Sequence, residues 1–137
     1  KVLIRDFDDD MLEKRKKMIE DQVAKTRAAF PEVKIDLTIK DGYRNMHKVM
    51  KDYPFIVGFA EEAMQKADVK PVRLPIRGGT DGSRLTFMGL PCANIFTGAE
   101  NFHSRLEWVS ARTMMKSAET IIYLAEVWFE KGTSIKV

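Results

Sequence analysis

Glycines crowd the segment 77–82 (RGGTDG), which could hold a negatively charged ligand. Gly78, Gly79 and Gly82 lack a Cβ, so the backbone can come close to a ligand and donate its amide groups to a carboxylate or phosphate. The spacing fits neither the dinucleotide fingerprint nor the Gly-Lys-Ser/Thr ending of a nucleoside-triphosphate loop. The segment therefore predicts either a binding loop or an ordinary turn from a strand into a helix, and it disfavours a nucleotide site.

A second polar loop, at residues 101–105 (NFHSR), contains His103, which could act as a metal ligand, a general base or a hydrogen-bond donor. The alternative interpretation is a surface or supporting histidine. The other histidine, His47, lies near Lys48 and Lys51 in a polar stretch and is expected to face solvent. No His-x-Asp, His-Glu-x-x-His or Cys-x-x-Cys pair occurs, and one histidine cannot hold a catalytic zinc ion alone.

The hydroxyl and thiol groups give little support for a covalent hydrolase. No Gly-x-Ser-x-Gly frame surrounds Ser83, Ser104 or Ser110. Cys92 is the single cysteine, so it cannot form an internal disulfide. This composition favours a reducing compartment, and we expect a cytoplasmic protein.

Charge and hydropathy exclude two further classes of function. The 23 Lys and Arg residues and 20 Asp and Glu residues are interspersed, and the net charge of +3 comes from no basic block. We therefore expect no nucleic-acid surface. No apolar run approaches the roughly 20 residues that a membrane span needs, so we expect no membrane segment.

The N-terminal elements that would position these loops read as a strand, a helix and a strand. Residues 1–7 resemble a strand, the carboxylates at 8–10 favour a helix start, and Pro31 ends the helix. From 33 to 40, apolar and polar residues alternate, as in a strand with one buried face. Because so small a unit is unstable alone, we expect further strands from missing sequence or from a partner.

The rest of the chain alternates helices with short strands. We expect a helix opened by Pro54, a strand at 72–76, a short helix at 83–88 ended by Gly89, a strand at 93–97, and a helix from an N-cap at Ser110 to Gly132. The expected inward face of the last helix comprises Met114, Ala118, Ile121, Ile122, Ala125, Trp128 and Phe129. This order is the α/β pattern. We place the boundary between this part and the N-terminal strand, helix and strand between about residues 43 and 54.

Several short motifs resemble one known family. They are, in chain order, IRDFD at 4–8, YRNM at 43–46, PIRGGTDGS at 75–83, FMGLP at 87–91, NIFTG at 94–98 and NFH at 101–103. In this order they are similar to the C-terminal third of peptidase T, a family of tripeptide aminopeptidases. The chain also lacks an initiator Met and begins inside an apparent element, so we expect it to be a fragment.

The resemblance implies an α/β zinc domain interrupted by an inserted α+β lid or dimerisation domain. Residues 1–50 would be the second half of the lid domain, and residues 51–137 the closing part of the catalytic zinc domain. A homodimer through the lid domain is implied as well. The alternatives are a dipeptidase or deacylase of the same clan, or a non-catalytic binding or dimerisation module that uses unpaired strand edges.

The resemblance also implies the site. His103 would be one ligand of two zinc ions, while the other ligands and the glutamate base would lie before Lys1, so the fragment alone is expected to be inactive. Gly79 and Thr80 would line the pocket for the tripeptide. Arg5 and Arg77 would offer guanidinium groups to its carboxylate. The chain departs from the commoner family pattern at Ser104, Ala93 and Ala99, which bears on the exact geometry of the site.

Overall fold

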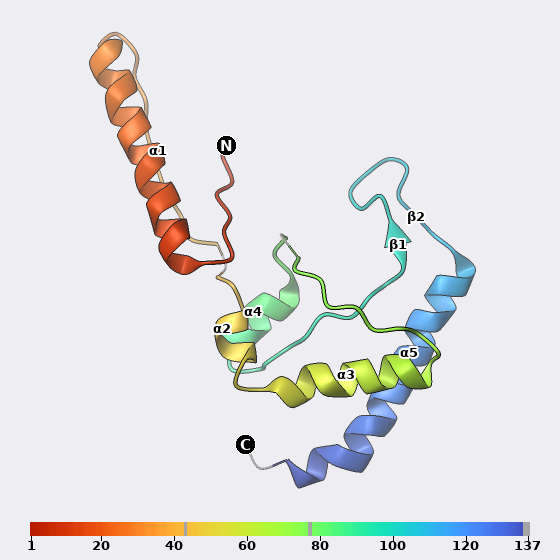
Figure 1. The fold of residues 1–137 in the computed structure, drawn as a ribbon. Coiled ribbons are helices and arrows are strands. Elements are labelled where there is room, and N and C mark those ends of the chain that lie inside the picture. Colours follow the sequence, from red (N-terminus) through yellow and green to blue (C-terminus); the bar gives the residue numbers. More distant parts are fainter. Residues whose placement is uncertain (43, 77, 136–137) are drawn as a thin grey trace.

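The structure is a computed structural model that describes residues 1–42, 44–76 and 78–135. The described part is mostly helical, with one small antiparallel sheet (Figure 1). Its elements are α1 (Asp9–Ala29), α2 (His47–Met50), α3 (Pro54–Lys66), α4 (Asp81–Phe87), β1 (Ala99–Glu100), β2 (Trp108–Val109), α5 (Ala111–Lys131) and a final 3-10 turn, η1 (Gly132–Ser134).

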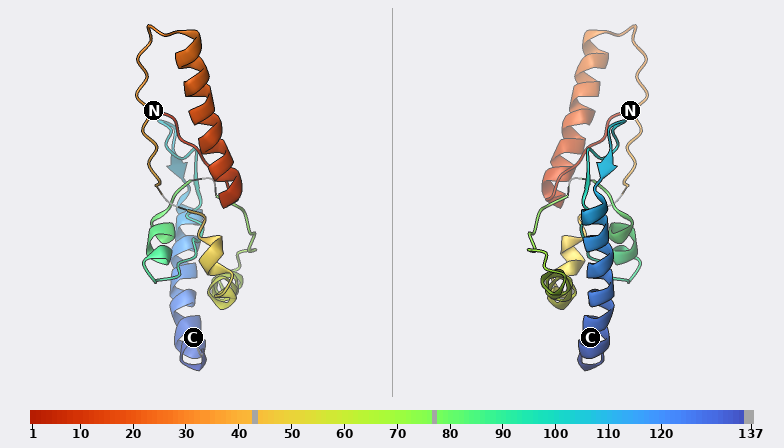
Figure 2. Two further views of the ribbon diagram at one scale, coloured as in Figure 1. Left: turned by 90° about the vertical axis from the view of Figure 1, so that its left-hand side faces the viewer. Right: turned by 90° about the vertical axis from the view of Figure 1, so that its right-hand side faces the viewer.

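Helix α1 confirms the prediction at its start and at its end. The Asp8 side chain accepts a hydrogen bond from the backbone N–H of Met11 at 2.8 Å and so caps the helix. Phe30 is the C-cap, immediately before Pro31. No residue of α1 is buried. The helix stands at one end of the molecule, and the C-terminal part of α5 lies at the other (Figures 1 and 2).

The strands predicted on either side of α1 are wrong. Residues 1–7 and 31–42 form no strand, although the second segment runs back beside α1 (Figures 1 and 2). A strand needs a neighbour for its backbone N–H and C=O groups, and the described residues supply none to either segment. Side chains hold the return segment instead: Lys16 Nζ pairs with Asp41 at 2.5 Å, and Arg27 donates to the Ile35 carbonyl.

Helices α3 and α5 make the core. Pro54 stands at the start of α3, as predicted, and the small side chains of Ala60, Ala63 and Ala67 are buried. Val127 of α5 is also fully buried, and α5 packs against α3. The contact continues into an aromatic cluster, in which the ring centroids of Phe59 and Trp128 lie 5.1 Å apart, edge to face, and Phe55 joins them.

Polar contacts reinforce the packing of α3 on α5. Lys116 Nζ donates to the Ala67 carbonyl at 2.7 Å, which places a cation at the C-terminus of α3, where the helix dipole favours positive charge. Lys66 pairs with Glu126 at 2.9 Å, and Lys131 pairs with a glutamate of α3. These ion pairs cross from one helix to the other, so they favour a single relative placement of the two helices.

The inward face predicted for α5 is mostly wrong. Thr120 and Val127 are 0% exposed, whereas Ile122 and Phe129, predicted to face inward, are 69% and 86% exposed. Of the predicted set, Trp128 contacts α3 through the aromatic cluster. The helix is apolar on more than one side, and periodicity cannot tell which side meets the neighbour. Its predicted N-cap, Ser110, and its end at Gly132 are confirmed.

The remaining strands also differ from the predictions. Neither 72–76 nor 93–97 is a strand in the structure. The sheet instead lies just beyond, where Ala99 pairs with Val109 and Glu100 with Trp108. A hairpin finds its partner within a few residues, whereas the predicted strands require a sheet that the described residues do not contain. The predicted α/β sheet is therefore absent from the part of the chain that the structure describes.

Candidate functional site

The glycine-rich segment leads directly into α4. Thr80 is the N-cap, and its Oγ1 accepts from the backbone N–H of Ser83 at 3.3 Å. Gly79 precedes this cap and is exposed. Arg77 lies outside the described residues. The segment therefore leads into a helix without a preceding strand, and the backbone of Gly79 is accessible.

A buried threonine that sequence reasoning missed anchors α4. Thr86 is 2% exposed, and its hydroxyl donates to the Gly82 carbonyl at 2.7 Å and accepts from the Cys92 N–H at 3.0 Å. The chain is closely packed at Gly82, where a Cβ would lie 3.2 Å from Asn94 Oδ1 and 3.3 Å from the Cys92 carbonyl oxygen. The one hint in the sequence was a threonine four residues after a glycine, which allows this bond within a helix.

His103 lies in the loop that joins β1 to β2. Its φ is 64°, and that of Asn101 is 56°, so two residues with side chains adopt the left-handed conformation. The backbone N–H of His103 donates to Glu107 Oε2 at 3.1 Å. Sequence reasoning missed Glu107, whose role depends on a loop geometry that spacing does not reveal. The loop is exposed, so the His103 side chain is accessible.

Two further bonds tighten the same loop. The Ser104 N–H donates to the Asn101 carbonyl at 3.0 Å, and Ser104 Oγ accepts from the Leu106 N–H at 3.1 Å. Ser104, one of the departures from the commoner family pattern, therefore takes part in two bonds that tighten the loop. The backbone of His103 is therefore held between a turn on one side and a carboxylate on the other.

The predicted site residues are not joined to one another. Within the described ranges, no hydrogen bond or ion pair connects Arg5, Thr80 and His103, and Arg5 is exposed. The same ranges contain no group of three or more His, Cys, Asp or Glu side chains that could hold a metal ion. His103 is a suitable donor, but these residues do not fit a zinc site by themselves.

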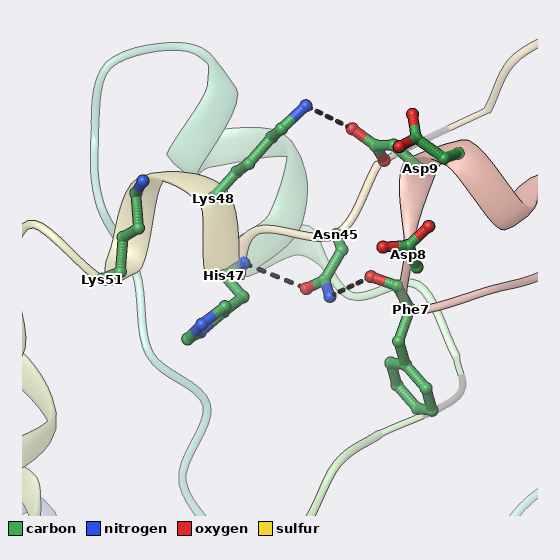
Figure 3. A pocket seen from close by; sticks show the side chains of 8 residues that line it. Phe7, Asp8, Asp9, Asn45, His47, Lys48 and Lys51 are labelled. Carbon is green, nitrogen blue, oxygen red and sulfur yellow. Dashed lines mark hydrogen bonds and ion pairs between the residues drawn. The ribbon is translucent and has the colours of Figure 1, made fainter.

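A surface pocket of about 330 Å³ lies where the start of α1 meets α2 (Figure 3). Asn45 Nδ2 donates to the Phe7 carbonyl at 2.8 Å, while its Oδ1 accepts from the His47 N–H at 3.0 Å. Lys48 Nζ bonds to Asp9 Oδ2 at 2.5 Å, and this bond holds the pKa of the Asp9 carboxyl below its ordinary value. His47 is exposed, as predicted. The pocket therefore lies where hydrogen bonds join the N-terminal segment and the start of α1 to α2 and the residues just before it.

None of the described helices has a stretch long and apolar enough to cross a membrane. No protein-family profile matches the chain.

Curated relatives match it closely. Peptidase T of Latilactobacillus sakei is 46% identical over 130 residues, which are 95% of this chain and 32% of that protein. Peptidase T of Vibrio parahaemolyticus is 46% identical over 94% of the chain, and that of Clostridium perfringens 42% over 94%, each match again spanning 32% of the relative. The chain thus spans about a third of the length of these relatives. Over nearly all of its length, therefore, this chain resembles a portion of peptidase T.

Proposed function

We propose that this chain is part of a tripeptide aminopeptidase, which removes the N-terminal residue of tripeptides. The 46% identity to a peptidase T over 95% of the chain is the observation that carries this proposal. Because the match covers 130 of the 137 residues, it includes both loops that could do chemistry. Since the chain spans about a third of such relatives, the activity belongs to the longer polypeptide, and the chain alone is expected to be inactive.

His103 is one ligand of a pair of zinc ions in this proposal. Its exposed position on a loop held by Glu107 and Ser104 supports the role, because a ligand benefits from a backbone that is fixed before the metal binds. The remaining ligands and the general base would come from sequence that the chain does not include. When bound, the metal ions would lower the pKa of water and polarise the peptide carbonyl.

Tripeptide recognition is assigned to backbone and guanidinium groups. The exposed backbone of Gly79 could donate to a carboxylate or carbonyl, and the Thr80 hydroxyl, which accepts from Ser83, still has a hydrogen to donate. Arg5 and Arg77 would bind the terminal carboxylate, for which a planar guanidinium suits bidentate pairing. Arg5 is exposed, which leaves it free to reach such a ligand.

The proposal divides the chain between two domains. Residues 1–50 would belong to a lid domain through which two copies form a homodimer, and residues 51–137 to the catalytic zinc domain. The separate position of α1, away from the packed pair α3 and α5, supports this division (Figure 1). The free cysteine, Cys92, supports a cytoplasmic location.

The test compares this chain with a longer protein in which the unmatched two thirds of Latilactobacillus sakei peptidase T are restored. We expect two zinc ions per subunit and hydrolysis of tripeptides from the longer protein alone. In that protein, His103→Ala should lower activity by at least about 100-fold and reduce zinc content. His47→Ala is the matched control, because His47 is exposed and should leave both unchanged.

Three results would contradict the proposal. Hydrolysis of tripeptides by the chain alone, lost in His103→Ala, would show that the missing ligands are not needed. A longer protein that cleaves dipeptides or acylated amino acids in preference to tripeptides would assign it to a related activity. Absence of both zinc and hydrolysis from the longer protein would favour a binding or dimerisation module.

A further inference from the structure

Asp41 and Gly42 form an exposed Asp-Gly pair at the end of the segment that returns beside α1 (Figure 1). Neither residue belongs to a helix or a strand, and the Asp41 side chain is 57% exposed. A Cβ added at Gly42 would meet no atom within 4 Å, so the space beside its backbone is open. Because glycine has no side chain to shield its amide nitrogen, this nitrogen is accessible to the carboxyl group of Asp41.

An aspartate followed by glycine can rearrange without an enzyme or a co-reactant. The Gly42 amide nitrogen attacks Cγ of the protonated Asp41 carboxyl group, and a C–N bond forms. The bond from Cγ to the hydroxyl oxygen breaks, and the amide proton leaves with the hydroxyl as water. Water then opens the resulting succinimide ring at the main-chain carbonyl of Asp41 and breaks the original peptide bond. The product is an isoaspartyl linkage, in which Cβ and Cγ lie in the main chain and the former carbonyl group is a free α-carboxylate.

The fold protects the other Asp-Gly pair of the chain. Asp81 and Gly82 are the first two residues of α4. Helical dihedral angles hold a side-chain carboxyl carbon away from the amide nitrogen that follows it, so ring closure requires the first turn to open. The surroundings are also crowded, since Asn94 and the Cys92 carbonyl oxygen lie within 3.3 Å of the place where a Gly82 Cβ would be. The two pairs therefore have the same sequence and different environments.

Lys16 of α1 restrains Asp41. Its Nζ bonds to Asp41 Oδ1 at 2.5 Å and to Glu13 Oε1 at 2.8 Å. The bond from Lys16 lowers the pKa of the Asp41 carboxyl, and the charge of Arg44 acts in the same direction. A lower pKa reduces the protonated fraction of Asp41, and the ionised form reacts slowly because its oxygen is a poor leaving group. Since the carboxylate is more than half exposed, the pair is weak and slows the reaction without preventing it.

We propose that Asp41 is a site of spontaneous isomerisation whose rate is restrained by Lys16, whereas Asp81 is protected by α4. The product presents a free α-carboxylate in an exposed stretch, which is the group that isoaspartyl methyltransferases recognise and methylate. The rearrangement also lengthens the main chain and removes the carboxylate that Lys16 binds, so it should loosen the return segment from α1. This chemistry uses no catalytic activity of the chain and is independent of the proposed function.

The test incubates the folded chain at physiological temperature and neutral pH and follows isoaspartate with time. Cleavage after glutamate places the two Asp-Gly pairs in separate peptides, and electron-transfer fragmentation identifies isoaspartate in each. Methyl transfer from S-adenosylmethionine by an isoaspartyl methyltransferase measures the total independently. We expect isoaspartate to accumulate at least about fivefold faster at Asp41 than at Asp81. In urea, which unfolds α4, the two rates should become similar.

Three variants test the chemistry and the restraint. Gly42→Ala should slow isomerisation of Asp41, because a methyl group hinders the amide nitrogen, and the open space at Gly42 accommodates it. Lys16→Met should accelerate isomerisation of Asp41, because the carboxyl group loses its partner and its pKa returns toward the ordinary value. Lys14→Met is the matched control, since it makes the same change at an exposed position of α1 and should leave the rate unchanged.

Circular dichroism of each variant should match that of the parent chain, which shows that the rates compare folded molecules. Equal rates at Asp41 and Asp81 in the folded chain, or a faster rate at Asp81, would overturn the proposal. So would a Lys16→Met variant that isomerises no faster than Lys14→Met, because the ion pair would then not restrain the reaction.

Discussion

Gly98→Ala tests the packing of the segment before the His103 hairpin against α5. Gly98 has a φ of +76°, and a Cβ placed there would lie 2.6 Å from Thr113 Cβ and 2.9 Å from its Oγ1. The neighbour cannot withdraw easily. Thr113 Oγ1 lies within hydrogen-bond distance of both the Gly98 carbonyl, at 3.3 Å, and Ser110, the N-cap of α5. The substitution therefore combines backbone strain with a steric clash.

The magnitude follows from these two terms. A left-handed conformation costs an L-residue about 1–2 kcal/mol. Insertion of a methyl group into a closely packed contact costs about 1–3 kcal/mol more. We therefore expect Gly98→Ala to lower the free energy of unfolding by about 2–5 kcal/mol.

Substitutions at two other glycines measure the backbone strain separately from the steric clash. Gly89 has a φ of +96°, but a Cβ added there would meet no atom within 4 Å, so Gly89→Ala should cost only the strain, about 1–2 kcal/mol. Gly58 lies inside α3, also with nothing within 4 Å, so Gly58→Ala should stabilise by about 0.5–1 kcal/mol through helix propensity. Urea unfolding followed by circular dichroism measures all three. A Gly98→Ala variant no less stable than Gly89→Ala would refute the reasoning.

Two further predictions concern polar contacts. Thr86→Val should destabilise the protein by about 1–3 kcal/mol in the same unfolding assay, because it leaves the Cys92 N–H without its buried acceptor. Thr86→Ser keeps the hydroxyl and should retain most of the stability. Equal stability of the two variants would contradict this reasoning. Lys48 lowers the pKa of Asp9 in the folded state. Their contact should therefore stabilise the folded state at pH values above the ordinary Asp pKa, which is near 4, and this stabilisation should be lost as the pH falls through the lowered pKa. An NMR titration of Asp9 should show its pKa rising toward the ordinary value in Lys48→Met, and an unchanged pKa would exclude the contact.

The site illustrates what could be anticipated from spacing and what could not. The polar loop with His103 and the turn after the glycines could be located from residue types alone, and Gly89, with its positive φ after α4, follows the known preference at helix ends. Thr86 and Glu107 could not be found in this way. Their partners, the Cys92 and His103 N–H groups, come within reach only when the chain turns back on itself.

The helices were determined by the sequence itself, because their hydrogen bonds join residues four apart and their caps lie within a few residues. Asp8, Pro54 and Ser110 therefore mark helix starts that hold in the structure. Strand pairing and the buried side of α5 were decided only by tertiary structure. Alternation at 33–40 shows that a strand could form, but a ladder requires a second backbone. Likewise, the apolar residues of α5 indicate burial, but packing against α3 selected Thr120 and Val127 and left Ile122 and Phe129 exposed.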